Sequence, residues 1–297
     1  MDKKMEQFLK KSRIKNNEKT TENYKLSLTT FKNFYAGELD KLSLDDIDDY
    51  TISLQDKGLK LTTINNRLRD LRVFLNWCYK NKYIERIEIH LLKNHEIDIM
   101  PLELEQLKEI YEACRYNESF CNYRDYIIMR ILEETGIRIS ECLKLRIYDV
   151  DLDRQTIKIN LTKNKKNRPV YFTQAMLKEL KKYLELRQQF LYNKNLAATS
   201  FFVTNSGGQP SKRNIQARIK KYGELAGIPV RVSPHTFRHT FARNYLVNGG
   251  DMIVLQEILG HSSLDMVRRY VRLFSHDKQD QYNTVMAKYN RHKRKLN

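Results

Sequence analysis

The stretch PHTFRHTFARNYLVNGGDMIVLQEILGHSSLDMVRRY, residues 234–270, carries three groups of residues suited to chemistry at phosphate. It holds a His-x-x-Arg pair at His235 and Arg238, a Leu-Gly-His that ends at His261, and Tyr270 nine residues after that histidine. Upstream, residues 135–145 read TGIRISECLKL and place Arg138 after a glycine, with Glu141 three residues further on. Each group alone is common, but this ordered set with these spacings is specific.

These residue types suit the cleavage of a phosphodiester by a side-chain nucleophile. A pentavalent phosphorus gathers negative charge on its non-bridging oxygens, and planar guanidinium groups such as those of Arg138 and Arg238 offer paired donors to it. His261 can donate a further hydrogen bond. A tyrosine hydroxyl is a poor nucleophile at neutral pH, so Tyr270 needs a proton acceptor. His235 lies one helical turn from Arg238 and is our candidate acceptor.

The ordered set resembles the tyrosine recombinase (phage integrase) family, in particular its short, Xer-like members. The resemblance covers the C-terminal domain by motif, whereas the N-terminal part fits the family's SAM-like core-binding domain by pattern and position only. It implies that Tyr270 attacks DNA to form a covalent 3′-phosphotyrosine, with Arg138, His235, Arg238 and His261 as catalytic partners. Glu141 would orient Arg138 or His235 from behind.

The resemblance also implies a lysine on a β-hairpin that protonates the leaving 5′ oxygen. The predicted hairpin turn holds Lys163, Lys165 and Lys166, and the family's register selects Lys163. The turn has Thr162 and Asn164 in place of the family's common glycines, which leaves Lys165 and Lys166 as alternatives.

Composition and charge agree with a nucleic-acid partner. The chain has 297 residues, 41% of them hydrophobic, and a formal net charge of +18. Residues 101–297 carry 35 Lys and Arg against 20 Asp and Glu, whereas residues 1–100 carry 19 against 16. A polyanion is the natural partner of such a surface, because bound cations release counterions from phosphates. The alternative is the Lys- and Asn-rich composition that an AT-rich genome produces.

Other classes of protein are disfavoured by the sequence. No run of about 18 apolar residues could cross a membrane, and the N-terminus lacks a secretion signal. The four cysteines have no zinc-binding spacing, so we expect reduced thiols in a cytoplasmic protein. No metal-binding or Walker motif is present, and we expect neither a metal nor ATP as cofactor.

The pattern of apolar residues predicts a mainly α-helical chain with a small β-sheet. Residues 1–87 predict a four-helix domain, in which Thr20 or Thr21 caps the second helix and Thr62 or Thr63 starts the fourth. Residues 88–101 are interpreted as a linker, the alternative being a loop within one domain, and residues 102–297 as the catalytic domain.

Within residues 102–297, the segment RDYIIMRILEET predicts a buried helix that ends at Gly136. Residues 155–160 and 168–172 predict a β-hairpin, and FFVT at 201–204 predicts a short buried strand. The segment LDMVRRYV and the end of the chain predict helices. The last of these can dock on a neighbouring protomer or pack on its own domain.

Cationic and polar side chains on predicted helices are candidates for DNA contacts, the alternative being ordinary solvated helix faces. The N-terminal candidates are Lys25, Asn65, Arg67, Arg69 and Arg72, and those of the catalytic domain are Lys212, Arg213 and Arg218.

The resemblance implies a C-shaped clamp on double-stranded DNA with an inverted-repeat core site. Four protomers would pair two sites and pass through a Holliday junction, with accessory DNA-binding proteins as further partners. Integration, excision or resolution of a mobile element or replicon would be the outcome. Two other interpretations remain open: a catalytically silent DNA-binding accessory protein, and a type IB topoisomerase-like enzyme that relaxes DNA without pairing sites.

Overall fold

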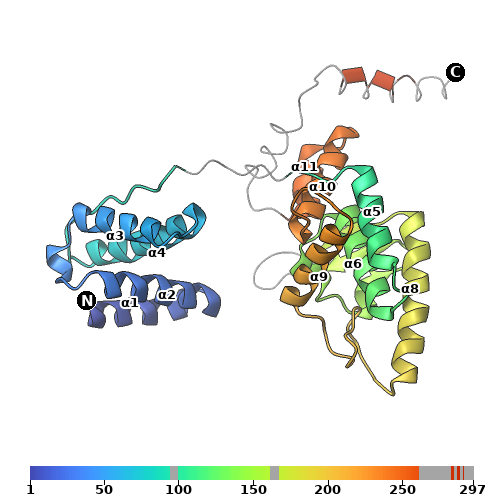
Figure 1. Cartoon of the computed structure of the whole chain (residues 1–297), viewed down its shortest axis with the longest axis horizontal. Helices are drawn as coiled ribbons and strands as arrows, with labels where there is room; N and C mark the ends of the chain where they lie inside the picture. The colour runs from blue at the N-terminus through green and yellow to red at the C-terminus, as the bar shows by residue number, and fades with distance from the viewer. Residues whose placement is uncertain (94–99, 161–166, 261–281, 284–285, 288–289, 291–297) are drawn as a thin grey trace. The chain divides into compact units, whose positions relative to one another are not determined.

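The computed structural model describes residues 1–93, 100–160 and 167–260, together with 282–283, 286–287 and 290. The chain divides into two units, Met1–Ile97 and Asp98–Asn297, each with its own hydrophobic core (Figure 1). Lys163, His261 and Tyr270 lie outside the described residues, as do the predicted helix LDMVRRYV and most of the predicted end helix.

The N-terminal unit is a bundle of four α-helices with one short 3-10 helix. Apolar side chains at helical spacing give each helix one buried face, and Phe31, Leu68 and Phe74 are fully buried where these faces meet. In chain order the elements are α1 (Asp2–Lys15), α2 (Glu18–Phe34), η1 (Leu39–Lys41), α3 (Leu44–Asp56) and α4 (Leu61–Lys80).

The predicted cap of α2 is wrong by three or four residues, and the predicted start of α4 is one or two residues late. Helix α2 is capped by Asn17, whose side chain accepts a hydrogen bond from the backbone N–H of Thr20. The Thr21 hydroxyl is instead within hydrogen-bond distance of the Ser12 hydroxyl on α1. Helix α4 begins at Leu61 after Lys60, without a side-chain cap. Asparagine is among the strongest N-caps, so the earlier polar residue defines the start of α2.

Residues just after α4 pack on the N-terminal bundle. Ile89 is 4% exposed, and the Asn65 side chain bonds both backbone groups of Leu92, at 2.9 Å each. Part of the segment interpreted as a linker is therefore fixed to the first unit by a side chain of α4.

The C-terminal unit is built around one helix that is buried on nearly all sides, as predicted. Helix α6 (Phe120–Thr135) contains Ile127, Ile128 and Leu132, all fully buried. Besides the short α7 (Ile139–Cys142) that follows it, it packs against four long helices, which leaves few of its faces in contact with water. These are α5 (Leu104–Arg115), α8 (Gln174–Asn193), α9 (Lys212–Leu225) and α10 (Pro234–Val247).

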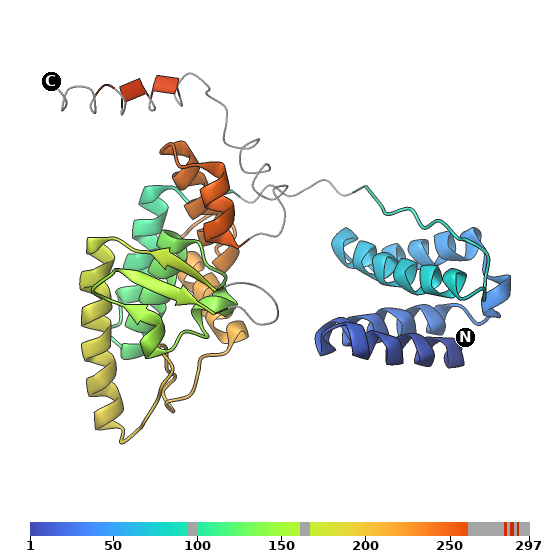
Figure 2. The same cartoon turned by 180° about the vertical axis from the view of Figure 1, so that it is seen from behind.

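A three-stranded antiparallel sheet follows α6 in the chain and lies beside these helices (Figure 2). The predicted hairpin is confirmed as β2 (Thr156–Ile159) and β3 (Arg168–Tyr171), with Ile159 opposite Arg168. A third strand, β1 (Val150–Asp151), was not predicted. It follows two short helical turns, α7 (Ile139–Cys142) and η2 (Ile147–Asp149).

The prediction of a strand at residues 201–204 is wrong. Phe201, Phe202 and Val203 are fully buried, but they form no strand. The carbonyl oxygen of Phe201 accepts hydrogen bonds from the Tyr183 hydroxyl and from Arg187 Nε, both on α8. Side chains therefore occupy the acceptor that a neighbouring strand would need, so the apolar run is buried without joining the sheet.

Helices α10 and α11 (Met252–Leu259) share a small core of their own, in which Ala242, Leu255 and Leu259 are fully buried. Within the described residues, no helix is long and apolar enough to cross a membrane. All four cysteines are free, and three of them are buried.

Gly136 ends α6 in a left-handed conformation with φ of +62°. A Cβ there would lie 2.2 Å from Phe241 Cδ1 of α10. We therefore expect Gly136→Ala to combine backbone strain of about 1–2 kcal/mol with an overpacking cost of about 1–3 kcal/mol. Chemical denaturation should show this loss. Gly227→Ala is the matched control, because Gly227 has φ of +66° but nothing within 4 Å of its Cβ position. Equal losses in the two variants would contradict the predicted clash.

Candidate active site

Arg138 lies where the chain turns from the end of α6 into α7. It is the N-cap residue of α7, and its backbone N–H donates to Glu141 Oε2 at 2.8 Å. Its guanidinium donates to Glu141 Oε1 at 3.1 Å, to the Leu259 carbonyl at 3.4 Å and to the Gly260 carbonyl at 3.2 Å. The side chain remains 36% exposed, so an external anion can reach it.

Arg238 approaches the same place from α10, where it is 5% exposed. Its Nη1 donates to the Gly136 carbonyl at 2.6 Å, and its Nη2 donates to the Leu259 carbonyl at 2.8 Å. Two arginines that lie 100 residues apart in the sequence thus converge on one carbonyl oxygen. That oxygen lies at the C-terminal end of α11, two residues before His261.

A third arginine, Arg168, joins the cluster and was not predicted as a site residue. Its Nε donates to the Ile258 carbonyl at 2.7 Å, and its two terminal nitrogens donate to the two carboxylate oxygens of Glu141 at 3.3 and 3.0 Å. The period-2 pattern of strand β3 was the available signal, because it places Arg168 on the same face as the buried Val170. A cation on a buried face requires a partner.

Glu141 lies between Arg138 and Arg168 and is charged. Burial alone would raise its pKa, but the hydrogen bonds from Arg168 and from the Arg138 backbone, with the charges of both arginines, lower that pKa below its ordinary value. Because the carboxylate contacts both guanidinium groups, it fixes Arg138 relative to Arg168 and offsets their mutual repulsion.

His235 lies in the first turn of α10, one helical turn before Arg238, and is exposed. Desolvation by the surrounding protein lowers its pKa, and the charges of Lys212, Arg238, Arg138 and Arg231 lower it further. The imidazole is therefore held in its neutral form at pH 7, in which one ring nitrogen can accept a proton.

Comparison with known families identifies the family of this chain. Residues 101–276 match the model "Phage integrase family", and residues 5–82 match "Phage integrase, N-terminal SAM-like domain". The chain belongs to the phage integrase family. It is a site-specific recombinase of the tyrosine type.

Curated integrase-family relatives are similar to this chain over most of their length. Tyrosine recombinase XerC of Thermodesulfovibrio yellowstonii is 32% identical over 84% of both chains, and that of Bacillus subtilis is 29% identical over 92% of this chain and 90% of its own. Among solved structures, the Tn1549 transposon integrase shares the fold with a TM-score of 0.76 at 20% identity, covering 96% of this chain and 99% of that one. XerH recombinase gives a TM-score of 0.71 at 23% identity, with 91% and 80% covered.

The DNA-binding candidates of the integrase-family catalytic domain differ in their surroundings. Lys212 and Arg213 are exposed at the start of α9. Arg218, in contrast, forms an ion pair with the fully buried Asp125 of α6 and bonds Asn122 and the Tyr222 hydroxyl. Arg218 therefore holds α9 against α6, and this structural role accounts for it without a DNA contact.

The N-terminal candidates divide in the same way. Lys25, Arg69 and Arg72 are exposed, although Arg69 donates to Asn66 at 2.9 Å. Arg67 is half-buried and lies near Tyr50. Asn65 is 3% exposed and uses its amide on Leu92, so the structure argues against its predicted role in direct DNA contact.

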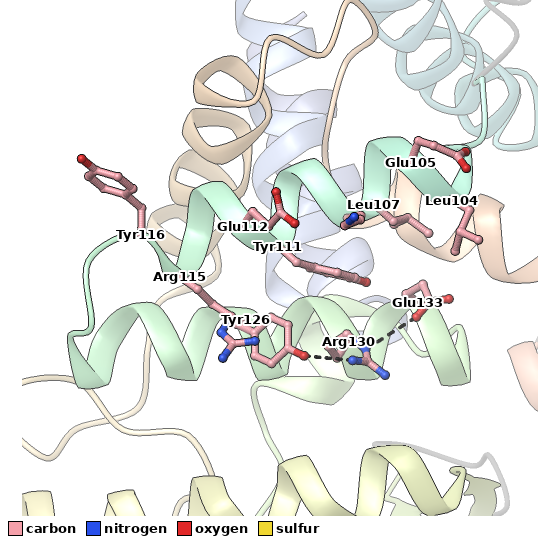
Figure 3. Close-up of a pocket in the computed structure, with 11 residues that line it drawn as sticks. Leu104, Glu105, Leu107, Tyr111, Glu112, Arg115, Tyr116, Tyr126, Arg130 and Glu133 are labelled. Carbon is pink, nitrogen blue, oxygen red and sulfur yellow. Dashed lines mark hydrogen bonds and ion pairs between the residues drawn. The ribbon is translucent and has the colours of Figure 1, made fainter.

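A separate groove of about 910 Å³ runs between α5 and α6 of the integrase-family domain (Figure 3). Its lining includes Tyr111, Tyr126, Arg130 and Glu133, and none of the arginines of the cluster. Arg130 donates to the Tyr126 hydroxyl at 2.9 Å and pairs with Glu133 (Figure 3). Among the described residues, no group of side chains could hold a metal ion.

The lowered pKa of His235 can be tested through Lys212, the cation with the largest effect on it. Removing that charge in Lys212→Gln should raise the His235 pKa toward the ordinary value of about 6.5. The histidine titration followed by NMR would measure this change. Lys221→Gln is the control, since Lys221 is an exposed cation on the same helix and does not appear among the charges that act on His235. An equal response to both substitutions would contradict a local effect.

The pairing of Glu141 predicts a pH-dependent stability. Glu141→Gln should lower the free energy of unfolding at pH 7 by roughly 3 kcal/mol, because two arginines lose their shared anion. The folded-state pKa of Glu141 is lowered, so its contribution is complete above the unfolded value of about 4.3 and is lost as the pH falls through the folded value. Urea titrations should therefore show the two proteins converging in acid. A difference that persists unchanged at low pH would refute this assignment.

Proposed function

We propose that the chain cuts and rejoins double-stranded DNA with Tyr270 as nucleophile and Arg138 and Arg238 as the anion-binding groups. The observation that supports this most strongly is the convergence of the two guanidinium groups on the Leu259 carbonyl. The sequence continues from there directly into His261 and Tyr270. A scissile phosphate at this place would meet two arginines that come from separate parts of the chain.

In the proposed reaction, the Tyr270 oxygen attacks the phosphorus and forms a 3′-phosphotyrosine as the bond to the 5′ oxygen breaks. The phenol proton passes to His235, whose neutral ring the surrounding cations favour. Arg138, Arg238 and His261 bind the non-bridging oxygens, and Lys163 protonates the leaving 5′ oxygen. Attack by a 5′ hydroxyl of the partner strand reverses these steps and frees Tyr270.

Glu141 has a positioning role in this scheme. It bonds both the backbone and the guanidinium of Arg138, so it sets the direction in which that guanidinium points. The covalent intermediate conserves the energy of the phosphodiester bond, which is why neither a metal nor a nucleotide cofactor is included.

The proposed partner is a DNA duplex with an inverted-repeat core site. The net charge of residues 101–297 and the exposed Lys212 and Arg213 support a polyanionic ligand. Among structural neighbours, XerH is bound to its difH substrate and a lambda integrase fragment to a core site. We further propose that four protomers pair two sites and resolve them through a Holliday junction, with accessory DNA-binding proteins as further partners.

The outcome would be integration, excision or resolution of a mobile element or replicon. A silent accessory protein is a poorer explanation, because the described site keeps Arg138, Glu141, His235 and Arg238 together. A type IB topoisomerase-like enzyme would share the cleavage chemistry. It would differ only in that it rejoins the strand it has cut and does not join it to a second DNA site.

The target sequence must be found before the chemistry can be measured. Full-length Tyr270→Phe protein, which should bind without cleaving, can be used to select bound duplexes from a random library. An inverted repeat in the selected sequences would support the proposed core site and give the spacer length. A nicked suicide duplex is then made from that sequence.

We expect wild-type protein to form a covalent adduct with this nicked duplex and Tyr270→Phe to form none, because the variant lacks the attacking oxygen. Denaturing electrophoresis measures the adduct. Tyr245→Phe is the matched control, since Tyr245 is a tyrosine of α10 outside the arginine cluster, and it should retain the adduct. Recombinant product from two sites separates a recombinase from a relaxing enzyme. An adduct that survives in Tyr270→Phe would refute the assignment of the nucleophile.

A further inference from the structure

Arg168 lies in the arginine cluster, but the proposed reaction gives it no role as nucleophile, acid or base. All three of its side-chain nitrogens donate within the protein: Nε to Ile258 of α11, and the terminal pair to both oxygens of Glu141. A two-point contact with a carboxylate fixes the plane of the guanidinium as well as its position. One rigid side chain thus links the first residue of β3 to the end of α11.

Arg168 differs from Arg138 in exposure and from Arg238 in its partners, because its terminal nitrogens contact a carboxylate, whereas those of Arg238 contact backbone carbonyls. Its side chain is 11% exposed, against 36% for Arg138. Its contacts with Glu141 occupy the edge of the guanidinium that a phosphate would need. Arg168 is therefore placed to hold other groups rather than to bind substrate.

Gly260 shows how closely Arg168 and the end of α11 are packed. The glycine has φ of +61°, and a Cβ on it would lie 2.9 Å from Arg168 Cζ and 3.0 Å from its Nη1. The guanidinium therefore lies directly against the backbone of the residue that precedes His261. A movement of the Arg168 guanidinium would displace the Gly260 backbone, because no side chain lies between them.

Arg168 is also fixed at the hairpin side. It pairs with Ile159 in the sheet, and the sequence between these two residues contains the three candidate lysines. Ile159 is 1% exposed, so this end of the hairpin is anchored in the core. The backbone of Arg168 thus belongs to the strand that follows the lysines, while its side chain reaches the helix end that precedes His261.

We propose that Arg168 is a positioning residue that holds three parts of the active site in register. Through Glu141 it sets Arg138, through Ile258 and Gly260 it sets the start of the segment that leads to His261 and Tyr270, and through β3 it sets the lysine hairpin. This inference rests on the proposed function. It predicts that loss of Arg168 impairs catalysis far more than DNA binding.

The test compares Arg168→Met with Arg154→Met in the full-length protein. Arg154 lies in the turn between β1 and β2 of the same sheet and is 85% exposed. With the nicked duplex defined above at saturating protein, single-turnover adduct formation by Arg168→Met should fall about 100-fold, the loss typical of a misplacement of about 1 Å. Affinity for that duplex should stay near that of wild type, and Arg154→Met should match wild type in both measurements. Wild-type cleavage by Arg168→Met, or a loss of affinity that accounts for the whole defect, would overturn the proposal.

Two further variants separate positioning from general loss of folding. Arg168→Lys keeps the charge but not the two-point contact, so it should recover stability more than cleavage rate. The double variant Arg168→Met/Glu141→Gln also removes the negative charge of the carboxylate that has lost one of its two arginine partners, and it should likewise fold while remaining slow. Wild-type cleavage in the double variant would overturn the positioning role.

Amide exchange gives a reading that does not depend on DNA. In the free protein, residues 252–260 should exchange faster in Arg168→Met than in Arg154→Met, because the end of α11 loses a cap. Unchanged exchange would overturn the proposal. Absence of any wild-type adduct, with faster exchange in Arg168→Met, would instead refute the proposed function and leave the structural link standing.

Discussion

The carbonyl end of α11 is the point on which the described site depends. The last carbonyls of a helix have no partner within it and carry partial negative charge. Here the oxygens of Ile258, Leu259 and Gly260 accept hydrogen bonds from Arg168, Arg238 and Arg138. Three cations would repel one another in so small a space, but the helix end and the carboxylate of Glu141 offset that repulsion. These protein acceptors thereby hold the three guanidinium groups together.

Each arginine reaches this helix end only because a different part of the fold delivers it. The left-handed Gly136 ends the central helix and turns the chain so that Arg138 can cap α7. The carbonyl oxygen of Gly136 accepts a hydrogen bond from Arg238. Strand β3 delivers Arg168 and contacts α11. Packing of Phe241 against Gly136 keeps α10 close to the end of α6. The geometry of the site is therefore a product of core packing rather than of any single loop.

The sequence was sufficient for the parts of the site that local spacing defines, and insufficient for those that distant partners define. His235 and Arg238 share a helical turn, and Arg138 follows a glycine, so motif and chemistry agreed on them. For the predicted DNA contacts Arg218 and Asn65, the sequence does not reveal the structural partners Asp125 and Leu92, because these lie far away in the sequence. Arg168 was not predicted as a site residue because its partners Glu141 and Ile258 are also distant in the sequence, although strand alternation places it on a buried face. Lys163, His261 and Tyr270 stay predictions, since they lie outside the described residues.

The oxygen of Leu259 accepts hydrogen bonds from both guanidinium groups that are proposed to bind the phosphate. An arginine side chain carries about 2 kcal/mol of rotamer entropy, and most of it is lost when the guanidinium is immobilised. Because Arg138 and Arg238 are already held on this oxygen, that loss belongs to the free energy of folding and not to that of binding. An incoming phosphate would meet donors that are already ordered. The phosphate would have to replace the neutral Leu259 carbonyl as the acceptor of these hydrogen bonds, and its full negative charge favours that replacement. The affinity of the site would therefore depend both on the preordered donors and on this exchange of acceptors.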